Sequence, residues 1–121
     1  SNKNLRVIRY GEILLIAAEA ANELGDASSA CGYLNQVRKR AGLNEFNSTD
    51  QLEIRKVIWE ERRYELAFEH DRVFDLRRQG RIGEVLKANG INFVDNKHEL
   101  YPIPQRQIDL AEGKMKQNPG Y

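Results

Sequence analysis

Acidic side chains occupy an unusual position on a stretch from residue 52 to residue 69 that contains neither glycine nor proline. That stretch predicts a long helix. On a helical wheel with about 100° per residue, Glu61 and Glu65 fall within the arc of the apolar residues, which includes Ile58. The two carboxylates therefore point toward the expected core. Because an unpaired buried carboxylate costs on the order of several kcal/mol, cations must accompany them.

Arginine suits these carboxylates best, since its planar guanidinium donates two hydrogen bonds to one carboxylate. The arginines available for this purpose are Arg38, Arg40, Arg72, Arg77 and Arg78. We expect a structural ion network that joins the long helix to its neighbours. We assign this network to Glu61, Glu65, Glu69, Arg72 and Arg78.

Two other interpretations of the acidic cluster stay open. The charges can form solvated surface pairs one helical turn apart, which are common and individually weak. The other interpretation is catalysis or metal binding. A di-iron site requires Glu-x-x-His, but the residue three before His70 is Ala67, so this motif is absent. Acids that cleave a sugar must flank it across a cleft, which adjacent turns of one helix cannot do. We therefore assign no catalytic residue, no metal ligand and no cofactor.

The remaining reactive side chains also favour structural roles. His70 and His98 are expected at a helix junction and in a loop, because neither has further ligands at metal-site spacing. Cys31 is the single cysteine, which excludes an intrachain disulfide, and we expect it to be a small buried hydrophobe. The aromatic residues Tyr10, Trp59, Tyr64 and Phe68 stand at core-like helical positions.

Two helices that precede the acidic stretch form a predicted hairpin. Apolar residues repeat with helical spacing from Tyr10 to Leu24 before Gly25, and again from Ala27 to Ala41 before Gly42. A short link and small residues on the facing sides favour antiparallel packing of the tetratricopeptide type. The long helix should then start near a capping box of Ser48 and Gln51, with Thr49 as an alternative cap.

Short elements are expected after the long helix. Residues 72–79 and 82–88 predict helices that end at Gly80 and at Asn89-Gly90, and residues 91–94 predict a strand or an extended stretch. Residues 100–104 must be extended because of their prolines, with Pro104 opening a last helical turn. Residues 118–121 predict a tight turn. The fold class is all-α: a tetratricopeptide-like hairpin, a long central helix, short C-terminal helices and an extended Pro-rich tail.

Length and charge limit the function classes. The 121 residues, 40% of them hydrophobic, predict a single domain over residues 1–121. Nineteen Lys and Arg against 18 Asp and Glu leave a net charge of +1, which disfavours nonspecific binding of nucleic acid or anionic lipid. The longest apolar run covers residues 13–18 and is too short to cross a bilayer, so we expect this chain to be soluble.

Several motifs resemble one family when they are taken in order. They are the helix from Arg9 to Ala20, Leu34–Leu43, Glu61–Glu69 followed by Arg72 and residues 74–78, Pro102-Ile103-Pro104, and Gln117–Tyr121. Together they resemble the C-terminal part of the SusD/RagB family, the surface glycan-binding lipoproteins of Bacteroidetes uptake systems. The sequence departs from the family pattern at His70, where glycine is usual, at Val73, where an aromatic residue is common, and at Gln107, where an acidic residue is usual.

This resemblance implies a function without catalysis. It implies an oligosaccharide-binding protein that is lipid-anchored on the outer membrane, faces outward and covers a SusC-like TonB-dependent transporter. The Glu-Arg-Arg motif would then be scaffold. The lipidated cysteine, most helical repeats and many ligand contacts would precede residue 1, so we assign no ligand-binding residue here. A helical-hairpin module that binds another protein is the alternative function.

Overall fold

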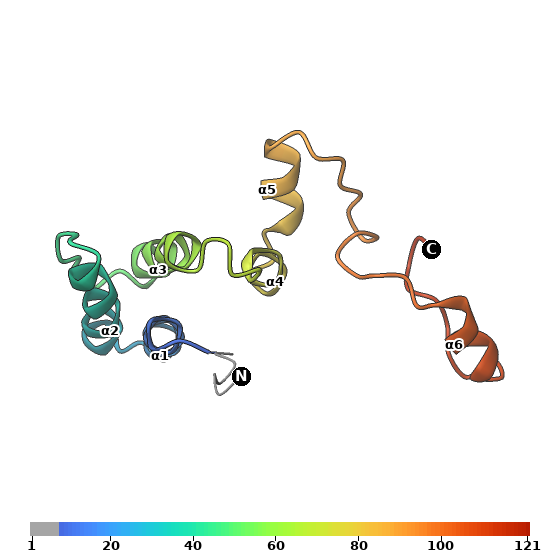
Figure 1. Ribbon diagram of the computed structural model, residues 1–121, viewed down its shortest axis with the longest axis horizontal. Helices are drawn as coiled ribbons and strands as arrows, with labels where there is room; N and C mark the ends of the chain where they lie inside the picture. The colour runs from blue at the N-terminus through green and yellow to red at the C-terminus, as the bar shows by residue number, and fades with distance from the viewer. Residues whose placement is uncertain (1–7) are drawn as a thin grey trace, which may run out of the picture. The chain divides into compact units, whose positions relative to one another are not determined.

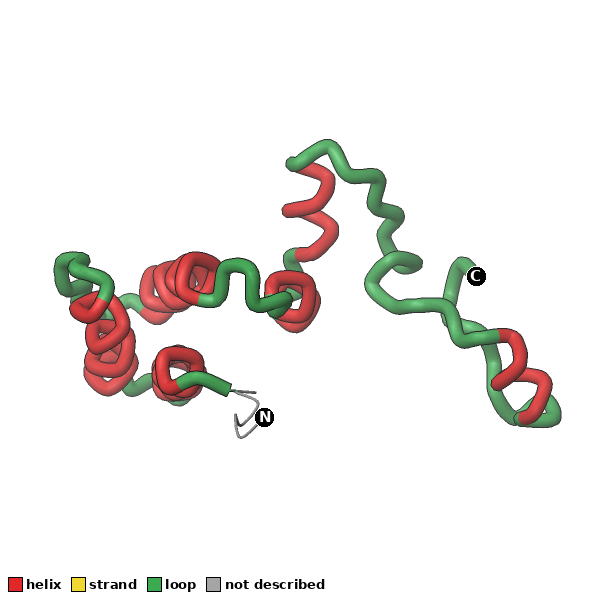
Figure 2. The backbone as a smooth tube through the Cα atoms, in the orientation of Figure 1, coloured by secondary structure: helices red, strands yellow, loops and turns green. Residues whose placement is uncertain are grey.

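A computed structural model describes residues 8–121 of the chain. Within these residues the structure has six helices and no strand (Figures 1 and 2): α1 (Tyr10–Glu23), α2 (Ala27–Arg40), α3 (Gln51–Glu65), α4 (Arg72–Arg78), α5 (Ile82–Ala88) and α6 (Gln105–Leu110). The predicted all-α class is confirmed. The chain forms two compact units, residues 1–71 and residues 72–121. The expectation of a single domain stays a prediction.

The first unit is built on the predicted helical hairpin. Gly25 adopts a φ of +82°, which a residue with a side chain rarely adopts, and it ends α1. Asp26 then caps α2 by accepting a hydrogen bond from the backbone N–H of Ser29 at 3.0 Å. The helices α1 and α2 pack against each other, and α3 packs against both. Three helices therefore share one core.

The core of the first unit is apolar and closely packed. Its buried residues are Leu14, Leu15, Ala18, Ala30, Cys31, Leu34, Val37, Ile54 and Ile58. The expectation that Cys31 is a small buried hydrophobe is confirmed. Asn22 is also buried, and its side-chain Nδ2 donates to the backbone oxygen of Gln51 at 3.1 Å. This contact joins the end of α1 to the start of α3.

Three of the aromatic residues expected in the core are exposed instead. Tyr10 and Tyr64 lie mostly in solvent, and Phe68 is 99% exposed. The prediction for Phe68 was wrong because α3 ends at Glu65, so the residues beyond it lose the helical phase. Tyr10 is the first residue of α1 and lies outside the arc that faces α2 and α3. Periodicity therefore located the core of α1 about one residue out of phase.

The N-terminus of α3 uses a different cap from the one predicted. Asp50 is the capping residue, and its Oδ1 accepts a hydrogen bond from the N–H of Leu52 at 2.8 Å. Ser48 accepts from the N–H of Asp50 at 3.1 Å and donates to Glu53 at 2.5 Å. Ser48 and Thr49 are thus not the cap. A capping box of Ser48 and Gln51 would make Gln51 the third residue of the helix, but Gln51 is its first residue.

The link after α3 is unusual because two residues with side chains adopt left-handed backbone angles. Phe68 has a φ of +66° and His70 a φ of +69°. Left-handed backbone angles bring the Cβ atom of an L-residue too close to its own backbone, and glycine has no Cβ atom. The observed angle at His70 gives a physical reason why glycine suits this position. The positive φ of Phe68 is not helical, so the helix cannot continue through residue 68 to the predicted end at residue 69.

The second unit has a smaller core of Leu76, Ile82 and Phe93. The helices α4 and α5 end at glycines with positive φ, Gly80 and Gly90, as predicted. Residues 91–94 form no helix or strand. Pro104 is the N-cap of α6 and not its first helical residue, a shift of one position.

The C-terminal tail folds back on the Pro-rich segment. The side chain of Gln117 accepts from the N–H of Ile103 at 2.8 Å and donates to its backbone oxygen at 2.9 Å. Asn118 donates to the backbone oxygen of Tyr101 at 2.7 Å. The predicted turn is present, with the N–H of Tyr121 bonded to the oxygen of Asn118 at 3.3 Å. Side-chain amides therefore supply hydrogen bonds to the backbone of this extended segment, which a neighbouring strand would supply in a sheet.

None of the helices in residues 8–121 combines the length and the apolar character that crossing a bilayer would need.

Candidate functional site

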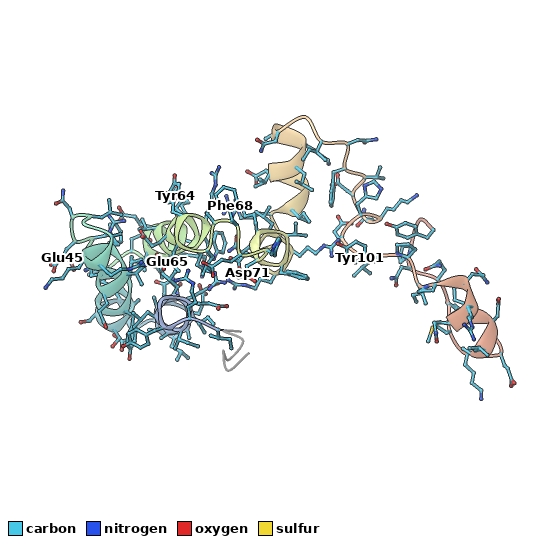
Figure 3. All side chains as sticks on the ribbon, in the orientation of Figure 1. Glu45, Tyr64, Glu65, Phe68, Asp71 and Tyr101 are labelled. Carbon is cyan, nitrogen blue, oxygen red and sulfur yellow. The ribbon has the colours of Figure 1, made fainter. Side chains whose placement is uncertain are left out.

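Glu65 (labelled in Figure 3) is the centre of the charged cluster in the first unit, and its side chain is 8% exposed. Arg9 donates from Nη1 to Glu65 Oε1 at 2.8 Å and from Nη2 to the backbone oxygen of the same residue at 2.7 Å. Arg40 bonds the other carboxylate oxygen. Arg9 also donates from Nε to Glu69 Oε2 at 2.7 Å. One carboxylate at the end of α3 therefore connects the start of α1 to the end of α2.

Glu61 forms a second charged contact one turn earlier on α3. The residue is buried, and its Oε2 accepts from Nη1 of Arg38 at 2.9 Å. Arg38 also donates from Nε to the backbone oxygen of Asn44 at 2.9 Å. This guanidinium thus joins α2, the loop after it and α3. Both carboxylates that the wheel placed toward the core meet arginines there.

The two arginine partners of Glu65 together outweigh the effect of burial on its pKa. Burial raises the pKa of Glu65. The hydrogen bonds and the positive charges of Arg9 and Arg40 lower it by more in total, so the net pKa lies below the ordinary value. The pKa of Arg9 is raised by its hydrogen bonds to Glu69 and Glu65. A carboxylate with both oxygens bonded to guanidinium and a lowered pKa is a poor general base near neutral pH. The arrangement suits an ion pair that holds helices together.

The residues assigned to the ion network fall into both units. Glu61, Glu65 and Glu69 belong to the first unit. Arg72 and Arg78 lie on α4 in the second unit, where Arg78 contacts Asp75 Oδ1 at 3.1 Å. The assignment of Arg72 and Arg78 to the network of the three glutamates stays a prediction.

Arg9 is a partner of Glu65 that was not predicted from the sequence. It stands just before α1, so no periodicity points to it. Gly11 in the first turn of α1 is a sequence signal that could have indicated a close contact there. A Cβ atom at Gly11 would lie 2.8 Å from Glu65 Oε1, closer than side chains tolerate. The glycine therefore allows Glu65 to approach α1.

Histidine and acidic residues form no metal site in the described region. Within residues 8–121 no three His, Cys, Asp or Glu side chains are placed to share a metal ion. His70 is exposed in the link after α3. His98 lies in the predicted loop, where its Nδ1 accepts from the N–H of Val94 at 3.0 Å and its ring meets Phe93 edge-on.

A cavity of about 410 Å³ adjoins the Glu65 cluster in the first unit. Its lining includes Tyr10, Leu14, Gln36 and Val37 together with the arginines of the cluster. The space lies between the start of α1 and the end of α2, where the hairpin opens. Its lining combines apolar and charged side chains.

A larger cavity of about 600 Å³ lies in the second unit. Its lining combines aromatic and aliphatic side chains with charged ones: Tyr101, Leu100, Ile82, Arg77, Arg78, Glu84, Asp95 and Glu99, with Gly80 and Gly83. Tyr101 (labelled in Figure 3) is 66% exposed. The Arg77 guanidinium carbon lies 4.2 Å from the centre of the Tyr101 ring. This stacking presents a tyrosine ring at the cavity.

Comparison with known proteins gives consistent matches over the whole chain. A family model described as the SusD family matches residues 1–121. SusD-like protein P2 of Formosa agariphila is 40% identical over all of this chain and 26% of its own length. Among solved structures, surface glycan-binding protein A from Bacteroides thetaiotaomicron matches 98% of this chain and 25% of its own, with 38% identity and a TM-score of 0.76.

A laminarin-binding SusD-like protein has also been solved. Its structure matches 98% of this chain and 23% of its own, with 36% identity and a TM-score of 0.77. The chain therefore spans about a quarter of the length of the relatives that it matches.

Proposed function

Because the chain belongs to the SusD family, we propose that it forms part of a glycan-binding protein that is not an enzyme and that serves nutrient uptake. The binding protein captures oligosaccharide outside the cell. Within it, residues 1–121 act mainly as scaffold. The remaining three quarters of a protein of the relatives' length supply other ligand contacts.

One observation carries this proposal: the similarity to SusD-like proteins that bind glycan. The match to the laminarin-binding protein covers 98% of this chain at 36% identity. Sequence identity and backbone similarity at this level support a shared role of this part of the chain in each protein. The sugar itself is set by side chains, so laminarin is one candidate glycan among several.

The charged cluster supports the scaffold role. Glu61 and Glu65 hold α1, α2 and α3 together through arginine, and both oxygens of Glu65 are engaged. A sugar hydroxyl would have to displace a guanidinium to reach Glu65, which would cost a charge-assisted hydrogen bond. We therefore place the function of these acids in stability and not in sugar recognition.

Family membership also supports the proposed location and partner. We propose that the complete protein is lipid-anchored on the cell surface at the outer membrane. It would work with a SusC-like TonB-dependent transporter that imports the captured oligosaccharide. Nucleic acid is not a proposed partner, since the net charge is only +1.

Titration with a glycan panel tests this function. Calorimetry of the full-length protein with laminarin, amylopectin, xylan and galactomannan should give saturable binding of at least one glycan. A reducing-end assay of the same mixtures after overnight incubation should show no cleavage. Absence of binding across the panel would contradict the glycan function, and release of reducing ends would indicate an enzyme.

One observation favours the alternative, a hairpin module that binds another protein. Helix α1 exposes Ile13 and Ile16, and Leu24 just beyond its end is exposed at a helical spacing from them, on a face away from the core. Such an apolar stripe suits a helix of a partner protein. Pull-down of a specific protein by a full-length protein that binds no glycan would favour this function.

A further inference from the structure

We propose that the cavity beside Tyr101 is a subsite for a neutral sugar ring. This inference rests on the proposed glycan-binding function and names a surface that performs it. It extends the role of residues 72–121 beyond scaffold.

The cavity has the dimensions and the lining of a small-molecule site. Its volume of about 600 Å³ falls within the range of roughly 300–1,000 Å³ that ligand pockets occupy. Ile82 and Leu100 supply aliphatic surface, and Tyr101 supplies an exposed ring. One face of a sugar ring carries C–H groups, which pack against such apolar surface.

The charges around the cavity nearly cancel. Two guanidinium groups, of Arg77 and Arg78, stand among three carboxylates, of Glu84, Asp95 and Glu99. A lining of this kind does not select a strongly anionic or cationic ligand, because either would meet repulsion as well as attraction. It does offer many hydrogen-bond donors and acceptors together. Hydroxyl groups both donate and accept, so a neutral ring that carries several of them fits this lining.

The polar lining also has unmet hydrogen-bonding capacity. Glu99 accepts from the N–H of Asn96 through Oε1 at 3.0 Å, but its buried Oε2 has no hydrogen-bond partner within residues 8–121. A buried acceptor without a donor raises the free energy of the empty site. A sugar hydroxyl is a donor of the kind that this acceptor lacks.

The Tyr101 ring is held in place before any ligand binds. Arg77 stacks on it at 4.2 Å and donates from Nη2 to the backbone oxygen of His98 at 3.4 Å. Asn118 also donates to the backbone oxygen of Tyr101 at 2.7 Å, and the Tyr121 hydroxyl donates to the backbone oxygen of Leu100 at 3.2 Å. Because the ring and its backbone are tethered, binding costs little ordering entropy. The C-terminal residues thereby support the subsite.

Substitution of Tyr101 tests the subsite in the full-length protein. The probes are the glycans of the panel above, and the variant is Tyr101→Ala, measured by calorimetry against the glycan that the unmodified protein binds most tightly. Loss of the stacking ring should raise Kd about tenfold. Tyr101→Phe keeps the ring and should raise Kd less than Tyr101→Ala.

Tyr64→Ala is the matched control. Tyr64 is 68% exposed, close to the 66% of Tyr101, and Arg63 lies 6.0 Å from the centre of its ring. It belongs to the first unit and lines neither cavity. This variant should leave Kd within about twofold of the unmodified value.

The outcomes separate the subsite from the general function. If the unmodified protein binds a glycan and Tyr101→Ala binds it with unchanged Kd, the subsite is wrong and the glycan function stands. If the unmodified protein binds nothing in the panel, both are wrong. Should Tyr101→Ala fail to fold, hydrogen exchange of residues 97–104 in the unmodified protein decides: saturating glycan should slow it, and unchanged exchange would overturn the subsite.

Discussion

Glu65 shows how solvent exposure sets the strength of an ion pair. Its carboxylate is 8% exposed, whereas the side chains of its partners Arg9 and Arg40 are 34% and 62% exposed. The carboxylate therefore loses most of its water, while each guanidinium keeps contact with solvent. Removing the carboxylate leaves two cations that water can partly satisfy. The cost should then be below the ~3–5 kcal/mol of a fully buried pair.

Glu65→Ala should lower the free energy of unfolding by about 1–3 kcal/mol at neutral pH. The substitution removes the charge-assisted bonds to both arginines and leaves their donors unpaired. Thermal unfolding followed by circular dichroism measures the effect. Lys114→Ala in an exposed turn is the control and should change the melting temperature little. A shift for Glu65→Ala no larger than that of the control would contradict a structural role.

The difference between unmodified protein and Glu65→Ala should also depend on pH. The folded pKa of Glu65 is lowered, so the unfolded chain takes up the proton first as the pH falls. The stabilisation is complete above the unfolded pKa of about 4.3 and is lost as the pH falls through the lower folded pKa. The two melting temperatures should therefore converge toward pH 3. A constant difference from pH 7 to pH 3 would contradict the ion pair as the cause.

At the scale of the helices, two glycines that look alike in sequence have opposite roles. Gly11 lies in the first turn of α1, where a Cβ atom would meet Glu65 Oε1 at 2.8 Å. Gly32 lies in the middle of α2, where a Cβ atom would have nothing within 4 Å. The first glycine makes room for the contact between α1 and α3. The second only adds flexibility to a helix.

Alanine substitutions at these two sites should shift stability in opposite directions. Gly32→Ala should stabilise the chain by about 0.5–1 kcal/mol, because alanine favours the helix and meets open space. Gly11→Ala should destabilise it by about 1 kcal/mol, since the new methyl group displaces a carboxylate that two arginines hold. Urea denaturation of the pair measures both effects. Equal stabilisation by both substitutions would mean that Glu65 moves away freely.

At the scale of the whole molecule, the two units have cores of very different size. The buried cluster of the first unit draws on three helices, whereas that of the second consists of Leu76, Ile82 and Phe93. Stability grows with the apolar area that is removed from water. Side-chain hydrogen bonds, such as those of Gln117 and Asn118 to the Pro-rich segment, accompany this small core in the second unit. It is therefore expected to open more readily.

Amide hydrogen exchange should report this difference. In the 121-residue chain, the helical amides of Leu15 and Ile58 should exchange at least about tenfold more slowly than those of Leu76 and Leu86. NMR at neutral pH measures the exchange rates of the two groups. All four residues lie inside helices, so the comparison is between helical amides. Comparable protection in both groups would mean that the chain opens as one cooperative unit.

Local signals in the sequence predicted most of the secondary structure. The helix over residues 82–88 was predicted with both of its ends, and Gly25, Gly42, Gly80 and Gly90 all adopt the positive φ that stops a helix. Such signals work because capping and helical hydrogen bonds involve residues within one turn of each other. The resemblance to the family rested on several motifs in order, and the family match over residues 1–121 confirms it.

The sequence by itself determined that Glu61 and Glu65 face the core, because helical phase is a local property. Only the tertiary structure decided that Arg9, 56 residues away from Glu65, is a partner, since that pairing depends on how α1 packs against α3. The exposure of Phe68 and the cavity beside Tyr101 were decided in the same way. Each depends on where one element ends and which segment folds back on it, and short-range periodicity carries no information about either.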